Sequence, residues 1–189
     1  MKIPNQKYPE LYQWITEFQE KTKFKRKIKL IYTNDKGGLG RVTALGNIKL
    51  QKKFIECFMD SQPNVVKFIL AHEFIHLIQE ELFSLYRVLL PKCYKPVVLL
   101  QELRANINGA ALAGLLNEEF RETQILLWIY EGNMRKQLTY ECGYPSRIQN
   151  IKFACKYNRY NDEAGYELIN DYYAVSSGPM NSVGPTKSF

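Results

Sequence analysis

Residues 70–82, LAHEFIHLIQEEL, contain the only two histidines of the chain, four positions apart and with a glutamate directly after the first. They overlap a longer segment, 65–78, whose residues are mostly large and apolar. A helix that is apolar on nearly every side is a buried one. We therefore expect a helix of about 62–88 at the centre of the domain, with Ser61 as its cap and Pro63 in its first turn.

The spacing of the two histidines suits a metal ion. On a helix, positions i and i+4 project from one face, so His72 and His76 can hold one ion between them. Glu73 then lies beside the ion, where its carboxylate can take a proton from a bound water. This is the HExxH pattern of zinc hydrolases, and random placement of two histidines gives it in about one chain in a thousand. The alternative is a buried helix with two hydrogen-bonded histidines, although burying such groups without partners costs several kcal/mol.

A catalytic zinc site usually has three protein ligands and one open position. The chain has no third histidine, so we expect a carboxylate to complete the set. Glu80 lies one turn too far along the same helix, whereas Glu102 lies on the next predicted helix, at about 96–117. Small residues, which let two helix backbones approach closely, share the face of Glu102: Ala105, Asn106, Gly109, Ala110 and Ala113.

Glu102 is thus the favoured third ligand, and other carboxylates stay open as substitutes. These are Glu118, Glu119, Glu163 and Glu167. Asn106, one turn beyond Glu102, is placed to hydrogen-bond the free ring nitrogen of a ligand histidine and so to fix its tautomer.

Length and composition indicate an ordinary globular chain. Its 189 residues are 46% hydrophobic and 24% charged, which suits one core and a small accessory part. The first residues lack the apolar run of a signal peptide, and no stretch reaches the roughly 18 apolar residues of a membrane span. We expect a cytoplasmic protein that does not bind membranes. The four cysteines form no CxxC pair, and we expect reduced, mostly buried thiols.

The net charge of +7 favours encounters with nucleic acid or with acidic proteins. The densest basic run, residues 21–32, alternates charged and apolar residues with the period of a strand. We interpret it as a solvated lysine face on a strand, of a kind that can guard a sheet edge. A nucleic-acid groove is the alternative, although no arginine-rich or aromatic-interleaved motif accompanies the run.

Hydrophobic periodicity predicts an α+β fold. Besides the two helices above, helices are expected at about 8–22, 51–60, 119–131, 145–157 and 162–174, and strands at about 28–33 and 41–50. The two strands predict a hairpin or small antiparallel sheet packed on the histidine helix. We expect a domain at 1–118, a helical C-terminal extension at 119–174 packed on it, and a disordered tail at 175–189.

The motifs LAHEFIHLI and ELRANINGAAL together resemble the ImmA/IrrE-type zinc metallopeptidases, in which the HExxH helix is followed by a helix with E-x-x-A-[ND] and small residues. The resemblance covers about residues 42–114. It implies a zincin-like, gluzincin fold with Glu73 as general base and three zinc ligands, His72, His76 and Glu102. It also implies a setting in phages or mobile elements, where such proteins are associated with cleaving or inactivating repressors.

We therefore expect a Zn²⁺-dependent metallopeptidase that hydrolyses a peptide bond in a protein substrate such as a repressor or other regulator. The strand near 42–50 is expected to bind extended substrate at its edge, and Tyr140 or Tyr144 to stabilise the transition state. Packing within a helical lobe is the alternative role for these tyrosines. Two other functions stay open: a DNA-associated, antirestriction-like protein, and a non-catalytic interaction module that keeps its metal for stability.

Overall fold

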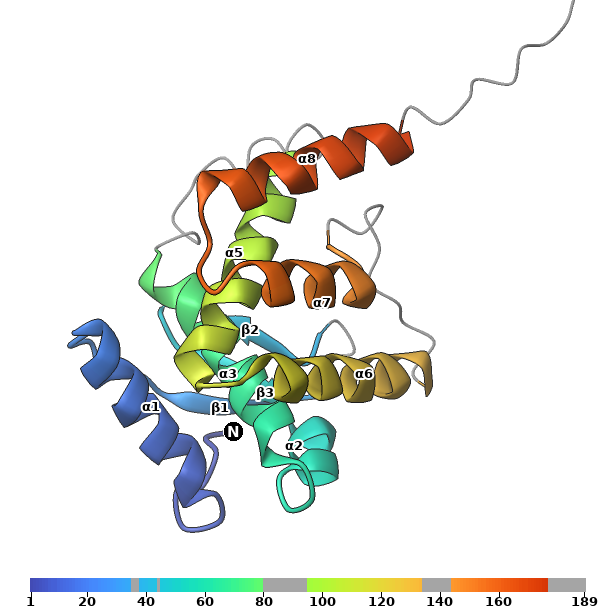
Figure 1. Cartoon of the computed structure of the whole chain (residues 1–189). Coiled ribbons are helices and arrows are strands. Elements are labelled where there is room, and N and C mark those ends of the chain that lie inside the picture. The colour runs from blue at the N-terminus through green and yellow to red at the C-terminus, as the bar shows by residue number, and fades with distance from the viewer. Residues whose placement is uncertain (35–37, 44, 80–94, 134–143, 177–189) are drawn as a thin grey trace, which may run out of the picture.

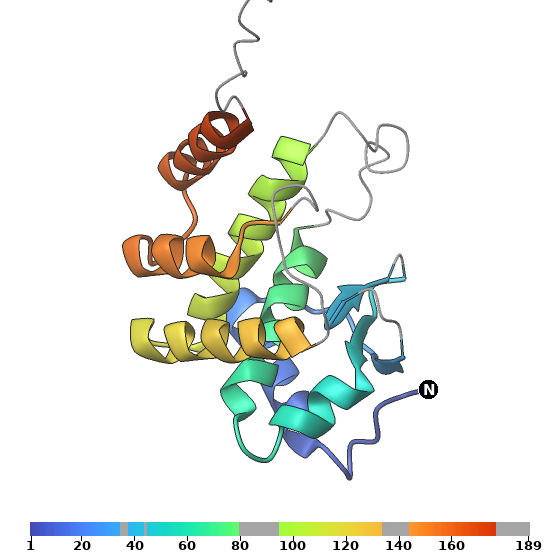
Figure 2. The ribbon, with the colours of Figure 1, turned by 90° about the vertical axis from the view of Figure 1, so that its right-hand side faces the viewer.

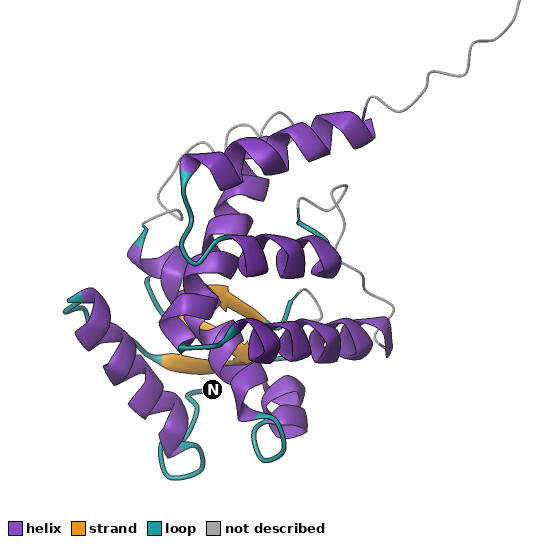
Figure 3. Ribbon diagram, in the orientation of Figure 1, coloured by secondary structure: helices purple, strands orange, loops and turns teal. Residues whose placement is uncertain are grey.

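The computed structural model describes residues 1–34, 38–43, 45–79, 95–133 and 144–176. These residues form an α+β structure in which helices predominate (Figure 3). The helices are α1 (Pro9–Thr22), α2 (Lys52–Phe58), α3 (Pro63–Ile78), α5 (Lys95–Ala113), α6 (Asn117–Asn133), α7 (Arg147–Lys156) and α8 (Asp162–Ser176), and the strands are β1 (Leu30–Thr33), β2 (Gly40–Val42) and β3 (Ile48–Gln51).

Helix α3 is the central element, as its apolar sequence predicts. Eleven of its 16 residues are buried, on all sides of the helix. It lies between the sheet and α5 in Figure 2, and Phe18 of α1 packs edge-to-face on Phe74 with ring centroids 5.7 Å apart. Pro63 occupies the first turn, but the N-cap is Gln62 and not the predicted Ser61.

The predicted C-terminal boundary of α3 is wrong. The helix ends at Ile78, because Gln79 already has a non-helical ψ of 3°. Residues 80–94, over which the prediction continued the helix, lie outside the described residues.

The sheet is mixed and not antiparallel as predicted. Its strand order is β1-β3-β2, with β1 parallel to β3 and β2 antiparallel to β3. The predicted strand at 41–50 is in fact two strands joined by a turn, in which Gly46 adopts a φ of 71° and Gly46 and Asn47 bond to Thr43. Because Gly46 provides a backbone conformation that other residues rarely adopt, the hairpin forms within this segment, and β1 pairs with β3 instead.

The chain start protects the outer edge of β1. The backbone N–H of Ile3 donates to Leu30, and that of Tyr32 donates to Met1. The basic run before β1 is largely irregular rather than a strand, although its lysines are solvated as predicted: Lys25, Lys27 and Lys29 are exposed. Among the described strands, β2 forms the other edge of the sheet.

Helix α5 ends earlier than predicted because of Gly114. This residue has a φ of 74°, and the N–H groups of Leu115 and Gly114 bond to the carbonyls of Ala110 and Ala111. This is the Schellman arrangement, which satisfies the last carbonyls of a helix and stops it. A new helix, α6, then starts at Asn117.

Helices α6, α7 and α8 follow one another up the molecule in Figure 1. Helices α7 and α8 pack on α5, whereas α6 packs on α3, where Phe120 meets Phe68 edge-to-face. Two clusters of buried apolar side chains hold the elements together. The larger one surrounds α3 and includes Phe120 and Leu127 of α6. The smaller one joins α5 to α7 and α8 through Leu99, Leu103, Ile107, Phe153, Tyr157, Ala164 and Leu168. Helix α5 therefore connects the two clusters.

Two further expectations concern the surface. Cys57 and Cys155 are unpaired but exposed, so the expected burial is wrong for these two thiols. Cys93 and Cys142 lie outside the described residues, as does the predicted disordered tail from residue 177 onward. No described helix combines the length and the apolar character needed to cross a bilayer.

Candidate metal centre

The site forms where α3 and α5 lie against each other, and Gly109 permits their close approach. A Cβ atom on Gly109 would lie 3.0 Å from the backbone N of His72 and 3.1 Å from its Cα. Because those are backbone atoms, only a residue without a side chain fits at this separation. The predicted stripe of small residues is therefore a helix contact directly opposite the first histidine.

Three side-chain donors converge at this contact. His72 Nε2 lies 3.0 Å from His76 Nε2 and 3.3 Å from Glu102 Oε2, and the distance between His76 Nε2 and Glu102 Oε2 is 3.5 Å. Donor atoms about 2.0–2.2 Å from a tetrahedral metal ion lie about 3.3–3.5 Å from one another. The three atoms are thus spaced to hold one metal ion.

The tautomer of His72 supports a cation between these donors. Asn106 donates from Nδ2 to Asn150 Oδ1 at 3.0 Å, so its own Oδ1 faces His72 Nδ1, also at 3.0 Å. An amide oxygen only accepts, which places the proton of a neutral His72 on Nδ1 and a lone pair on Nε2. That lone pair is directed toward the point on which His76 Nε2 and Glu102 Oε2 also converge, where all three atoms could coordinate one cation.

Burial and the neighbouring histidines act in opposite directions on the pKa of Glu102, which is 5% exposed. Burial raises the pKa of its carboxyl, but the contacts with His72 and His76 lower it by more. The pKa lies well below its ordinary value of 4.5, so the group is a carboxylate at neutral pH. A buried carboxylate beside two imidazoles is a donor set that suits a divalent cation.

Glu73 lies beside this group and faces the sheet. It is 8% exposed, and a Cβ on Gly40 of β2 would lie 2.7 Å from its Cγ and 2.8 Å from its Oε1. The carboxylate of Glu73 therefore packs directly against the backbone of the edge strand. It is not one of the three converging donors.

The other predicted site residues lie away from the three donors or outside the described residues. Tyr140 lies outside the described residues, and Tyr144 is half-buried ahead of α7, so the role of either as transition-state stabiliser stays a prediction. Of the substitute carboxylates, Glu118 and Glu163 are exposed. Glu119 accepts from the backbone N–H of Leu116 at the start of α6, and Glu167 pairs with lysines of α7. Among the described residues, Glu102 is thus the carboxylate that joins the two histidines in one donor group.

Sequence reasoning missed Asn150, which lies 44 positions from its partner Asn106. No motif or spacing marks it, because the contact arises only when α7 packs on α5. It also missed Gly40, which is one of several glycines in a loop-like stretch of the sequence.

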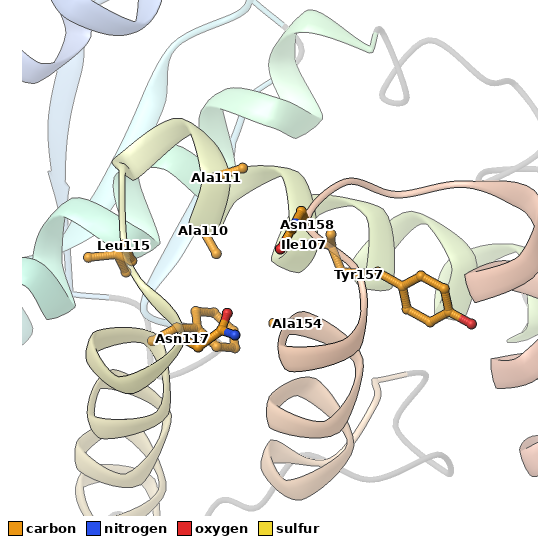
Figure 4. Close-up of a pocket in the computed structure, with 9 residues that line it drawn as sticks. Ile107, Ala110, Ala111, Leu115, Asn117, Ala154, Tyr157 and Asn158 are labelled. Carbon is orange, nitrogen blue, oxygen red and sulfur yellow. The ribbon is translucent and has the colours of Figure 1, made fainter.

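A pocket of about 170 Å³ lies at a different place, between α5, α6 and α7. Figure 4 shows Ala110, Leu115, Asn117 and Ala154 around it. None of its lining residues belongs to the metal-ligand group. The pocket is therefore not part of this centre.

Comparison of the chain with protein-family models, with curated proteins and with solved structures gives no match.

Proposed function

We propose that the protein is a zinc-dependent peptidase that hydrolyses a peptide bond in a protein substrate. The observation that carries the proposal is the convergence of His72, His76 and Glu102 on one point, with Glu73 next to it on the same helix. Two imidazoles and one carboxylate leave further coordination positions open, as catalytic zinc sites do.

The same donor set also occurs in iron oxygenases, where two histidines and a carboxylate bind Fe(II). The position of Glu73 favours zinc and hydrolysis. In the HExxH pattern the residue after the first histidine is the general base of a metalloprotease. The resemblance to ImmA/IrrE-type metallopeptidases supports the same assignment and suggests a repressor or another regulator as substrate.

Zinc bound at this centre would supply Lewis-acid chemistry and bring the pKa of a water molecule to roughly 7. The role of Glu73 is to accept the proton of the attacking water at its carboxylate and to pass it to the leaving amine. Burial of Glu73 against Gly40 restricts the side chain to one place, which favours such a transfer.

The edge position of β2 suits a polypeptide substrate. Gly40 on this strand touches Glu73, and β2 has a neighbour on only one side among the described strands. An extended peptide that adds to β2 as a further strand would run past the general base. The absence of a side chain at Gly40 lets the backbone of the strand approach the centre closely.

The proposal is tested by comparing the wild-type chain with Glu73→Gln. Both proteins are incubated with a cell extract and with unfolded casein, and new amino termini are counted by mass spectrometry. We expect both proteins to bind one zinc per chain, because Glu73 is not a ligand, and only the wild type to generate new termini. Equal cleavage by both proteins would exclude Glu73 as the base.

Two results would favour the other functions. Salt-sensitive binding to duplex DNA that is unchanged in Glu73→Gln, without cleavage of any protein, would indicate a nucleic-acid-associated protein. Stoichiometric iron in place of zinc would instead point to oxygen chemistry.

A further inference from the structure

Helix α7 reaches the metal centre through one buried side chain. Asn150 lies on α7 and is 1% exposed, and its Oδ1 accepts from Asn106 Nδ2 at 3.0 Å. Asn106 is itself 5% exposed and contacts His72 Nδ1. A continuous hydrogen-bonded chain of three side chains thus leads from α7 to the first histidine of α3.

The direction of these hydrogen bonds is related to the orientation of the Asn106 amide. An amide can turn by half a rotation and exchange its oxygen and nitrogen at little steric cost. In one orientation Asn106 presents its oxygen to His72, and in the other it presents its NH₂ group. In the structure Asn150 accepts from Nδ2, which matches the first orientation of Asn106 and the tautomer that leaves the lone pair of His72 on Nε2, where the other two donors converge.

Only the oxygen of the Asn150 side chain is hydrogen-bonded among the described residues. Its Nδ2 is buried and has no hydrogen-bond partner among the residues that the structure describes. An unsatisfied buried donor has an energetic cost. The contribution of Asn150 to this contact is therefore made by its oxygen, while its buried NH₂ group is a cost.

A second buried contact fixes the position of α7. Arg147, one turn before Asn150, forms a two-pronged ion pair with Glu131 of α6 and donates to Gln124 Oε1 at 2.9 Å. All three side chains are buried. A planar guanidinium held at several points restricts both rotation and sliding of the helix that carries it.

We infer that Asn150 is a positioning residue for the metal centre, which acts through Asn106 to fix the tautomer and the ring orientation of His72. The inference rests on the metal site of the proposed function, but not on its reaction. It makes the C-terminal helices part of the centre, because α6 and α7 hold the outer end of the hydrogen-bonded chain. The class of ligand that it supports is a divalent cation with affinity for imidazole.

Two measurements on the full-length protein test the inference. Zinc affinity is obtained by competition with a chromophoric chelator, and the ring-nitrogen NMR spectrum of the metal-free protein shows which nitrogen of His72 carries the proton. With only two histidines in the chain, a His76→Asn variant assigns the spectrum. In the wild type we expect His72 to carry its proton on Nδ1.

Asn150→Leu keeps the size of the side chain and removes the acceptor. We expect zinc affinity to fall about tenfold and the spectrum to show a mixture of His72 tautomers. Asn150→Asp keeps an acceptor oxygen and replaces the unbonded NH₂ group with a second oxygen, so the carboxylate can only accept from Asn106 Nδ2. It should restore the Nδ1–H tautomer and return affinity to within about threefold of the wild type. If Asn150→Leu does not fold, Asn150→Ala is measured in its place with the same expectation.

The matched control is Phe153→Leu, a change at a fully buried position of α7 in the second apolar cluster. It weakens the packing of α7 without touching the hydrogen-bonded chain, so it should lower thermal stability and leave zinc affinity and tautomer unchanged. The inference is overturned if the acceptor-free variant keeps the native tautomer and affinity, if Asn150→Asp is no better than that variant, or if Phe153→Leu lowers affinity as much. A wild type that binds zinc but cleaves nothing would contradict the proposed reaction and leave this inference standing.

Discussion

Glu102 supplies the only negative charge among the three converging donors. Its carboxylate is buried and contacts both imidazoles, so its removal leaves two neutral ligands and an uncompensated cation. We expect Glu102→Gln, which keeps the shape of the side chain, to weaken zinc binding by about 100-fold or more. Competition with a chelator of known affinity measures the change.

Glu118→Gln is the matched control for this substitution, because it removes a carboxylate that is exposed on α6. Its zinc affinity should equal that of the wild type. Unaltered affinity in Glu102→Gln, or equal losses in both variants, would transfer the role of third ligand to another residue.

Acidification should release the metal through the histidines rather than through Glu102. The pKa of Glu102 is held below its ordinary value of 4.5, so this ligand stays ionised in mild acid. Neutral imidazoles bind metal and protonated ones do not, and their ordinary pKa is about 6.5. Lower pH favours the protonated rings, so zinc affinity should fall as the pH is lowered, with up to two protons taken up per ion released.

Isothermal titration in buffers of different ionisation enthalpy measures that proton uptake. An affinity that stays constant down to about pH 5 would mean that the two imidazoles are not ligands.

At the scale of the elements, the contact between α3 and α5 depends on Gly109. In Gly109→Ala the new methyl would lie 3.0 Å from backbone N of His72, so α5 must move away by a few tenths of an ångström. Glu102, on the same helix, would then reach the histidines less well. We expect a loss of about 1–3 kcal/mol in the free energy of unfolding, with zinc affinity reduced several-fold.

Gly132→Ala on α6 is the control, since a Cβ there meets nothing within 4 Å. It should leave zinc affinity unchanged and should raise stability slightly, because alanine favours a helix over glycine. If both variants behave alike in the unfolding and zinc-binding measurements, the close helix contact does not control the centre.

Helices whose apolar residues repeat at helical spacing could be predicted from the sequence, and so could the three donor side chains that converge between two of these helices. The histidine pair lies within one helix, and Glu102 shares its face with small residues, so local spacing was sufficient. The sheet could not be predicted in this way. Its parallel pairing of β1 with β3 depends on a turn at Gly46, and the Gly-Asn pair there was the available signal.

The contact between Asn106 and Asn150 could not be predicted from the sequence, for a different reason. The two residues belong to helices that are separated along the chain, and they meet only because α7 packs on α5. Hydrophobic periodicity states which face of a helix is buried, but not which polar groups meet across the buried faces. Such contacts become visible only in the folded chain.

For the whole molecule, the size of the apolar core decides what metal removal does. Among the described residues, the larger cluster contains 29 buried hydrophobic side chains, from Ile3 to Ala154, which pack around α3. We expect chelation to lower the melting temperature by several degrees, as the loss of any ligand that binds only the folded state does, and to leave the helical circular dichroism spectrum unchanged. Loss of the helical signal on chelation would indicate a purely structural metal.

The proposed function depends on a single zinc ion bound by two imidazoles and one carboxylate between α3 and α5. It is tested by the metal content of protein purified without chelators, measured by mass spectrometry for the wild type and for His76→Ala. We expect one zinc per chain in the wild type and almost none in the variant. A wild type without stoichiometric transition metal, or equal zinc in both proteins, would contradict it.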